Sequence, residues 1–128
     1  YCNFHFSTLL QNKNGIVHAL LREIEQESVR LDGQRVDTIY FGGGTPSLLM
    51  VSAENTAITK SQIGELNLLI ESIRRNFTLA TDAEITLEAN PDDINEEMLE
   101  GWKAAGVNRL SIGVQSFRVA AAFSGLGP

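Results

Sequence analysis

Hydrophobic residues recur along this chain either every three to four positions, as in helices, or at every second position, as in strands. From residue 14 to residue 31 they return every three to four positions with charged residues between them, which predicts an amphipathic helix. Asp32 and Gly33 interrupt the pattern, and residues 36–41 are then β-branched and aromatic, which predicts a strand. The expected apolar stripe of the helix is Ile16, Leu20 and Ile24, with Val17 and Leu21 beside it.

The next helical pattern is the clearest in the sequence. Residues 50–60 are polar and aperiodic and predict a loop, after which Ser61 is expected to be the N-cap of a helix. Apolar side chains then recur at helical spacing, so they should share one buried face. They are Ile63, Leu66, Ile70, Ile73 and Phe77.

Two further stretches alternate strictly between apolar and polar residues. Residues 84–89 predict a strand with one polar face, ended by a proline turn. Asp93 followed by Glu96 resembles a capping box, so we expect a short helix that ends at Gly106. The alternation returns over residues 107–115, which predicts another strand. The core side of the short helix should consist of Met98, Trp102 and Ala105.

The order of these elements predicts the fold class. Helices alternating with strands at this spacing imply right-handed crossovers and parallel strands, hence an α/β protein. In an open doubly wound sheet both strand faces are covered by helices and should be apolar. Strands with a polar face instead favour part of a (β/α) barrel, in which the outer face meets helices and the lumen carries chemistry. Thr86 and Ser111 are expected to line that lumen without a chemical role.

Composition narrows the class of protein. The chain has 128 residues and a net charge of −6, and its ten Lys and Arg residues are scattered. Nucleic-acid and anionic membrane surfaces need clustered basic residues, so we expect neither partner. No apolar run approaches the roughly 20 residues that a membrane helix needs. With no recognisable signal peptide, a cytoplasmic, reducing location is predicted.

Residues 42–44 are three consecutive glycines and are the first candidate for a binding site. They follow an apolar strand directly, and their bare backbone could approach a small polar ligand closely. A flexible linker is the alternative, although its glycines would normally lie among polar residues. A phosphate loop is another, but the glycines lack a following Lys-Ser/Thr pair, and Pro46 disfavours an immediate helix.

Cys2 is the only cysteine and cannot form a structural zinc site or a disulfide within the chain. A lone cysteine is usually a small buried hydrophobe. Its place at the start of a chain without an initiator methionine favours a fragment whose partner cysteines lie upstream. His5 and His18 have no partner at metal-ligand spacing and are expected to be structural or solvated.

Four stretches together resemble the radical S-adenosylmethionine (SAM) superfamily. They are residues 1–6 (YCNFHF), 40–47 (YFGGGTPS), 88–91 (EANP) and 109–117 (RLSIGVQSF). Within it, the chain resembles the oxygen-independent coproporphyrinogen III oxidase family and its heme-chaperone branch. The resemblance implies that residues 1–117 are a partial radical SAM core domain, a TIM-like (β/α) barrel. Residues 119–128 lack charge and helical periodicity, so we expect residues 118–128 to be an atypical tail produced by truncation or a frame shift.

The resemblance also implies cofactors and ligand residues. In the family, a Cys-x3-Cys-x2-Cys loop holds a [4Fe-4S] cluster, and Cys2 matches its third cysteine. Three soft thiolates leave one iron open for SAM. Glu88 and Gln115 could otherwise be a solvated carboxylate and an ordinary strand-end amide. The positions that the resemblance assigns to SAM are Tyr1, Gly43, Gly44, Thr45, Glu88 and Gln115.

Phe4 separates the two branches of the family. The oxidase carries a further cysteine at this position, so the resemblance favours a heme chaperone that binds heme and passes it to an acceptor protein not yet identified. The alternative is the oxidase, which would decarboxylate coproporphyrinogen III with an electron donor for the cluster. No residue stands out as a general acid or base, so no catalytic residue is assigned.

Overall fold

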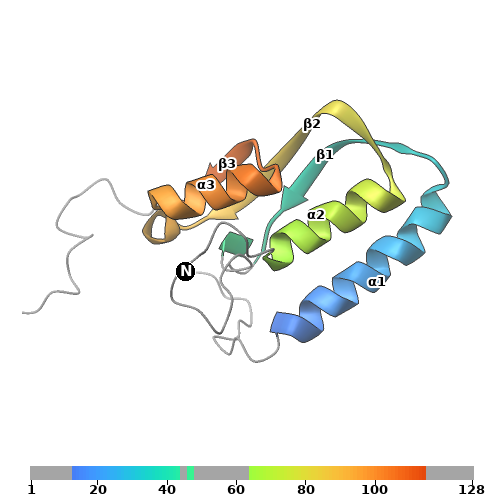
Figure 1. The fold of residues 1–128 in the computed structure, drawn as a ribbon, viewed down its shortest axis with the longest axis horizontal. Coiled ribbons are helices and arrows are strands. Elements are labelled where there is room, and N and C mark those ends of the chain that lie inside the picture. The colour runs from blue at the N-terminus through green and yellow to red at the C-terminus, as the bar shows by residue number, and fades with distance from the viewer. Residues whose placement is uncertain (1–12, 44–45, 48–63, 115–128) are drawn as a thin grey trace, which may run out of the picture.

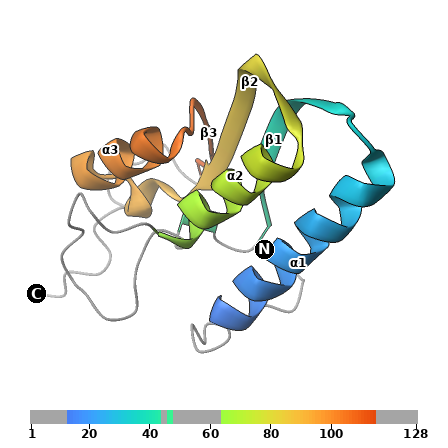
Figure 2. The same ribbon diagram turned by 45° about the vertical axis from the view of Figure 1, so that its right-hand side comes forward.

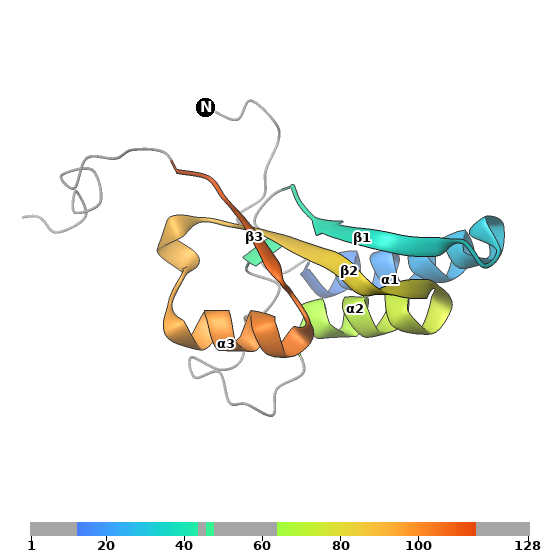
Figure 3. The same cartoon turned by 90° about the horizontal axis from the view of Figure 1, so that it is seen from above.

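The structure is a computed structural model that describes residues 13–43, 46–47 and 64–114. Three parallel strands form a sheet in the order β1-β2-β3, and the helices lie along one face of it (Figures 1 and 3). This arrangement confirms the predicted α/β class. The elements are α1 (Lys13–Leu31), β1 (Arg35–Phe41), α2 (Glu65–Asn76), β2 (Thr78–Ala89), the 3-10 turn η3 (Pro91–Asp93), α3 (Glu96–Ala105) and β3 (Arg109–Ile112).

The hydrophobic core lies between the sheet and helices α2 and α3. Alternate residues of β2 point toward the helices, and Leu87 at the centre of the sheet is fully buried. Trp102 from α3 and Ile70 from α2 pack in the same cluster. The opposite face of β2 carries Glu84, Thr86 and Glu88, as the alternation predicted. Helices on one side and polar side chains on the other are the arrangement of a barrel wall.

The prediction for α1 was correct in its limits but wrong in its buried face. Ile16 and Leu20 are 57% and 38% exposed, whereas Val17 is 3% exposed. Helix α1 packs along α2 (Figure 2), and its half-buried residues Leu21 and Ile24 continue the stripe that starts at Val17. A contact with one neighbouring helix buries only a narrow stripe, and the sequence does not show where that stripe is centred.

The predicted start of α2 was also wrong. The helix begins at Glu65 with Gly64 as its N-cap, and no side chain caps it. Ser61 and Ile63 lie outside the described residues. At the other end Phe77 is the extended C-cap residue and is only half-buried, while Leu69 joins the buried face in its place.

Strand β2 is longer than the sequence predicted, because it begins at Thr78 rather than at Glu84. Its pairing with β1 shifts between Val36 and Thr38, so a stretch of β2 bulges out of register. The alternation begins only after this bulge, which is why the sequence pattern missed the first part.

Asn108 ties the start of β3 to β2. Its side chain accepts a hydrogen bond from the Ile85 amide (2.8 Å) and donates one to the Ala83 carbonyl (2.9 Å). Its own amide donates to the Ile85 carbonyl (3.0 Å). The regular strand is shorter than the predicted residues 107–115, because pairing with β2 extends only from Arg109 to Ile112.

The predicted capping box of α3 is wrong by two residues. Asn95 is the N-cap, and its side chain accepts a hydrogen bond from the Met98 amide (2.9 Å). Asp93 ends the preceding turn η3, so its carboxylate is free to bond elsewhere.

Gly106 ends α3 as predicted, in the left-handed region with φ of 107°. We expect Gly106→Ala to lower the free energy of unfolding by about 1–3 kcal/mol, because any Cβ strains this backbone conformation. The new Cβ would also lie 2.6 Å from a guanidinium nitrogen of Arg74. Urea denaturation would measure the loss. Gly15→Ala is the matched control: nothing lies within 4 Å of its Cβ, and alanine in α1 should stabilise by roughly 0.5–1 kcal/mol. Equal effects at both glycines would contradict the prediction.

Candidate functional site

Glu88, near the C-terminal end of β2, contacts Gly43, which follows the C-terminal end of β1. The Gly43 amide donates a hydrogen bond to Oε2 of Glu88 (3.0 Å), although the two residues are far apart in sequence. Gly43 has φ of 78°, a conformation that favours glycine. Gly42 has no room for a side chain in the present arrangement, because an added Cβ would lie 2.4 Å from the Tyr40 ring. Both glycines are therefore needed for this approach of backbone to carboxylate.

Tyr40 completes the surroundings of the Glu88 carboxylate. Its hydroxyl donates a short hydrogen bond of 2.5 Å to Oε1, so each carboxylate oxygen receives one donor. Among the described residues both donors are neutral, and the negative charge of Glu88 is not compensated by an ion pair. A half-buried carboxylate held in this way attracts a cationic group of a ligand.

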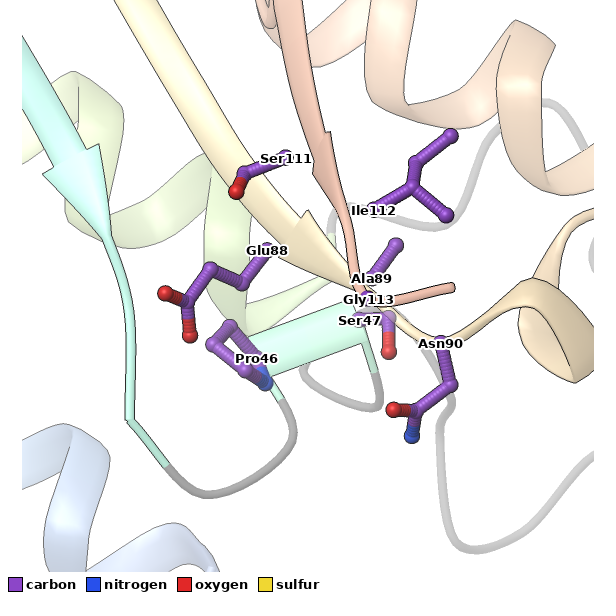
Figure 4. Close-up of a pocket in the computed structure, with 8 residues that line it drawn as sticks. All are labelled: Pro46, Ser47, Glu88, Ala89, Asn90, Ser111, Ile112 and Gly113. Carbon is purple, nitrogen blue, oxygen red and sulfur yellow. The ribbon is translucent and has the colours of Figure 1, made fainter. Parts of the chain in front are cut away.

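A cavity of about 240 Å³ opens beside this carboxylate. It is slightly smaller than the roughly 300–1,000 Å³ of typical small-molecule sites. Residues that follow β1 and the ends of β2 and β3 line it, and Glu88 and Ser111 are register partners that point to the same face of the sheet (Figure 4). The lining residues are Pro46, Ser47, Glu88, Ala89, Asn90, Ser111, Ile112 and Gly113.

A second contact joins the loop after β1 to the turn after β2. The hydroxyl of Ser47 donates a hydrogen bond of 2.6 Å to Oδ2 of Asp93. The side-chain amide of Asn90 donates a longer one to the same oxygen (3.4 Å). Ser47 is fully buried and Asp93 is half-buried, so this bond is partly shielded from water.

Of the residues that the sequence assigned to a ligand, the structure brings Gly43 and Glu88 into direct contact. The Glu88 side chain accepts two hydrogen bonds, so it is held in place at the end of its strand, and its role toward a ligand stays a prediction. Ser111 lies at the cavity wall, and Thr86 is buried and bonded to Glu84 and Arg109. The other assigned residues lie outside the described part of the chain: Tyr1, Cys2, Gly44, Thr45 and Gln115.

Sequence reasoning missed Tyr40, Ser47 and Asp93 as parts of the site. Tyr40 was noted only as part of the glycine motif, although it stands on the face of β1 that is in register with Thr86. Only the pairing of β1 with β2 shows that its hydroxyl reaches Glu88. Asp93 was interpreted as a helix cap, because carboxylates before helices usually have that role.

Two other kinds of feature are absent from the described residues. These residues contain no group of three or more His, Cys, Asp or Glu side chains placed to hold a metal ion. None of the helices there is both long and apolar enough to cross a bilayer. The cavity beside Glu88 is therefore the candidate that unites the glycine motif with a charged side chain.

Comparison with known proteins adds an independent observation. The sequence profile of the Radical SAM superfamily matches residues 1–120. The heme chaperone HemW of Escherichia coli (strain K12) is 39% identical over 119 residues, which are 91% of this chain and 28% of that protein. The mitochondrial radical S-adenosyl methionine domain-containing protein 1 of Mus musculus is 38% identical over 117 residues, 91% of this chain and 24% of that protein.

A solved structure is also similar. The coproporphyrinogen III oxidase HemN from Escherichia coli, described as a radical SAM enzyme, aligns with a TM-score of 0.72 and 30% identity. The alignment covers 92% of this chain and 24% of that one. The chain thus spans about a quarter of the length of these relatives.

Proposed function

This chain belongs to the radical SAM superfamily, and from that premise we propose that it forms the SAM-binding part of a heme chaperone. The observation that carries the heme assignment is the 39% identity with a protein named heme chaperone HemW, over 91% of the chain. The geometry that supports SAM binding is the contact of Gly43 with Glu88 at the edge of the cavity.

The chemistry of these residues suits SAM, which carries an ammonium group and a sulfonium centre. Glu88 would face the cationic part of the ligand, because its charge is balanced only by neutral donors among the described residues. The glycine backbone would lie along the methionine moiety without side chains in the way. Tyr1, Gly44, Thr45 and Gln115 are proposed to complete the site. A phosphate ligand fits less well, because Glu88 already occupies the Gly43 amide and would repel an anion.

A [4Fe-4S] cluster is part of the same proposal, with Cys2 as one of its ligands. The family holds the cluster with three cysteine thiolates, and this chain has one cysteine. We therefore propose cluster binding for the whole protein and not for this chain alone. When bound, the cluster and SAM would supply one-electron chemistry. The contribution of this chain is to bind and orient SAM and to exclude water from it. An electron donor and a heme-acceptor protein are the partners that the proposal needs.

The alternative is a coproporphyrinogen III oxidase. It is favoured by the similar HemN structure, with 30% identity. Phe4 stands where the oxidase is expected to have a cysteine, and this difference supports the chaperone. The two functions share the SAM site and differ in what the protein does to its tetrapyrrole.

One experiment distinguishes the two functions. The full-length protein that carries this chain would be reconstituted anaerobically with iron and sulfide, then assayed for heme binding and for conversion of coproporphyrinogen III. We expect a heme absorbance band to form in proportion to protein, with no loss of coproporphyrinogen III. Turnover of coproporphyrinogen III would overturn the chaperone assignment and establish the alternative. Absence of both activities would contradict the whole proposal.

A further inference from the structure

The loop that follows β1 is attached at two points to β2 and the turn after it. Among the described residues, the Gly43 amide donates to the Glu88 carboxylate (3.0 Å). Further along, the Ser47 hydroxyl donates to the Asp93 carboxylate (2.6 Å). Both acceptors therefore come from the same short segment, at the C-terminal end of β2 and in η3.

The second attachment is the better shielded of the two. Ser47 is fully buried, with 0% relative exposure, and Asp93 is half-buried. A hydrogen bond to a charged acceptor in such surroundings is among the stronger ones in proteins. Pro46, directly before Ser47, restricts the backbone φ and leaves the loop fewer ways to relax.

A backbone segment that is attached at two points has less freedom to lose when a ligand binds. Ordering a flexible loop costs affinity, and a loop that is already held in its bound geometry avoids part of that cost. Asp93 does not line the cavity, whereas Ser47 and Asn90, its two hydrogen-bond partners, do. Asp93 is therefore placed to act on the cavity through these neighbours.

We infer that Asp93 is a positioning residue: by binding Ser47 it limits the movement of the backbone that follows β1, and so keeps the Gly43 amide on Glu88. The part of this inference that concerns SAM affinity rests on the proposed function. The part that concerns the backbone does not rest on the proposed function, because hydrogen exchange at the Gly43 amide can be measured without any ligand.

The ligand-free test is hydrogen exchange at the Gly43 amide, measured by NMR on the chain. Ser47→Ala and Asp93→Ala should each speed exchange by about tenfold or more, because the loop loses its second attachment. Asp93→Asn keeps an acceptor oxygen for the Ser47 hydroxyl, so it should preserve most of the protection. Unchanged exchange in both alanine variants would overturn the inference, whether or not SAM binds.

The second test is SAM titration of the reconstituted full-length protein at a temperature well below unfolding. Both alanine variants should weaken SAM binding by roughly tenfold, and the double variant by no more than either single variant, because they remove one shared contact. Additive losses would overturn the inference.

Asp93→Asn separates positioning from direct action on the ligand. If Asp93 acted by its own charge, the asparagine variant would lose as much affinity as the alanine variant, which would overturn the positioning role. If Asp93 only stabilised the fold, its variants would lower the free energy of unfolding and leave SAM affinity and Gly43 exchange unchanged. That result would also overturn the positioning role. Failure of wild-type protein to bind SAM would contradict the proposed function, while the exchange result would still decide the loop attachment.

Discussion

Replacing Trp102 with alanine is expected to lower the free energy of unfolding by about 3–5 kcal/mol, the range for loss of a large aromatic side chain from a core. Trp102 is 1% exposed and packs between α3 and the sheet in the main hydrophobic cluster. Because domains are stable by only about 5–15 kcal/mol, a loss of this size would remove a large share of the free energy of unfolding. Urea denaturation followed by circular dichroism would measure it.

Leu99→Ala is the matched control on the same helix. Leu99 is 41% exposed, so its truncation should cost well under half as much as that of Trp102. Trp102→Phe should also be milder than alanine, because it keeps most of the apolar volume. It further removes a buried indole N–H for which the described residues offer no acceptor. Equal losses for Trp102→Ala and Leu99→Ala would show that the core is not centred where the structure places it.

Glu88→Gln is expected to weaken SAM binding by about 10- to 100-fold, which corresponds to loss of a charge-assisted contact. Glutamine keeps the shape of the side chain but removes the negative charge that we propose faces the cationic ligand. It also replaces one acceptor oxygen with an amide group, so the Gly43 amide keeps an acceptor only if the Tyr40 contact reverses and the phenol oxygen accepts from the glutamine NH2. Titration calorimetry with SAM on the reconstituted full-length protein would measure the change.

Glu84→Gln provides the control for charge. Glu84 lies on the same polar face of β2 and pairs with Arg109 (3.2 Å), away from the cavity lining. Its replacement should leave SAM affinity within about twofold, since exposed ion pairs contribute little. If both variants weakened binding equally, the effect would come from overall charge, and the assignment of Glu88 to the ligand would be wrong.

Much of the fold followed from local patterns. The 3.6-residue period placed α1, and the β-branched run placed β1 within one residue of its observed start. Gly106 ended α3 because a left-handed residue at that point nearly requires glycine. The less successful predictions were the start of α2, the cap of α3 and the length of β2. In each of these the competing choices have similar local energies, so packing decides between them.

The candidate site was predicted less completely than the fold. Gly43 stood out as one of three glycines directly after a strand, whereas Glu88 was assigned through the family resemblance, because a lone glutamate at a strand end is usually solvated. Tyr40, Ser47 and Asp93 have no local pattern that points to the site. Their contacts depend on which residues of β1 and β2 stand opposite one another, and a bulge in β2 makes that register unreadable from spacing alone.

The sequence by itself determined the order of helices and strands, the polar face of β2 and the glycines that permit a tight bend, because these depend on residues near one another in the chain. Only the tertiary structure decided that the Glu88 carboxylate receives the Gly43 amide and the Tyr40 hydroxyl, and that Asp93 binds Ser47 instead of capping a helix. Such contacts join residues more than forty positions apart. They form only when the parallel strands settle into one register, which is a property of the packed sheet and not of any local segment.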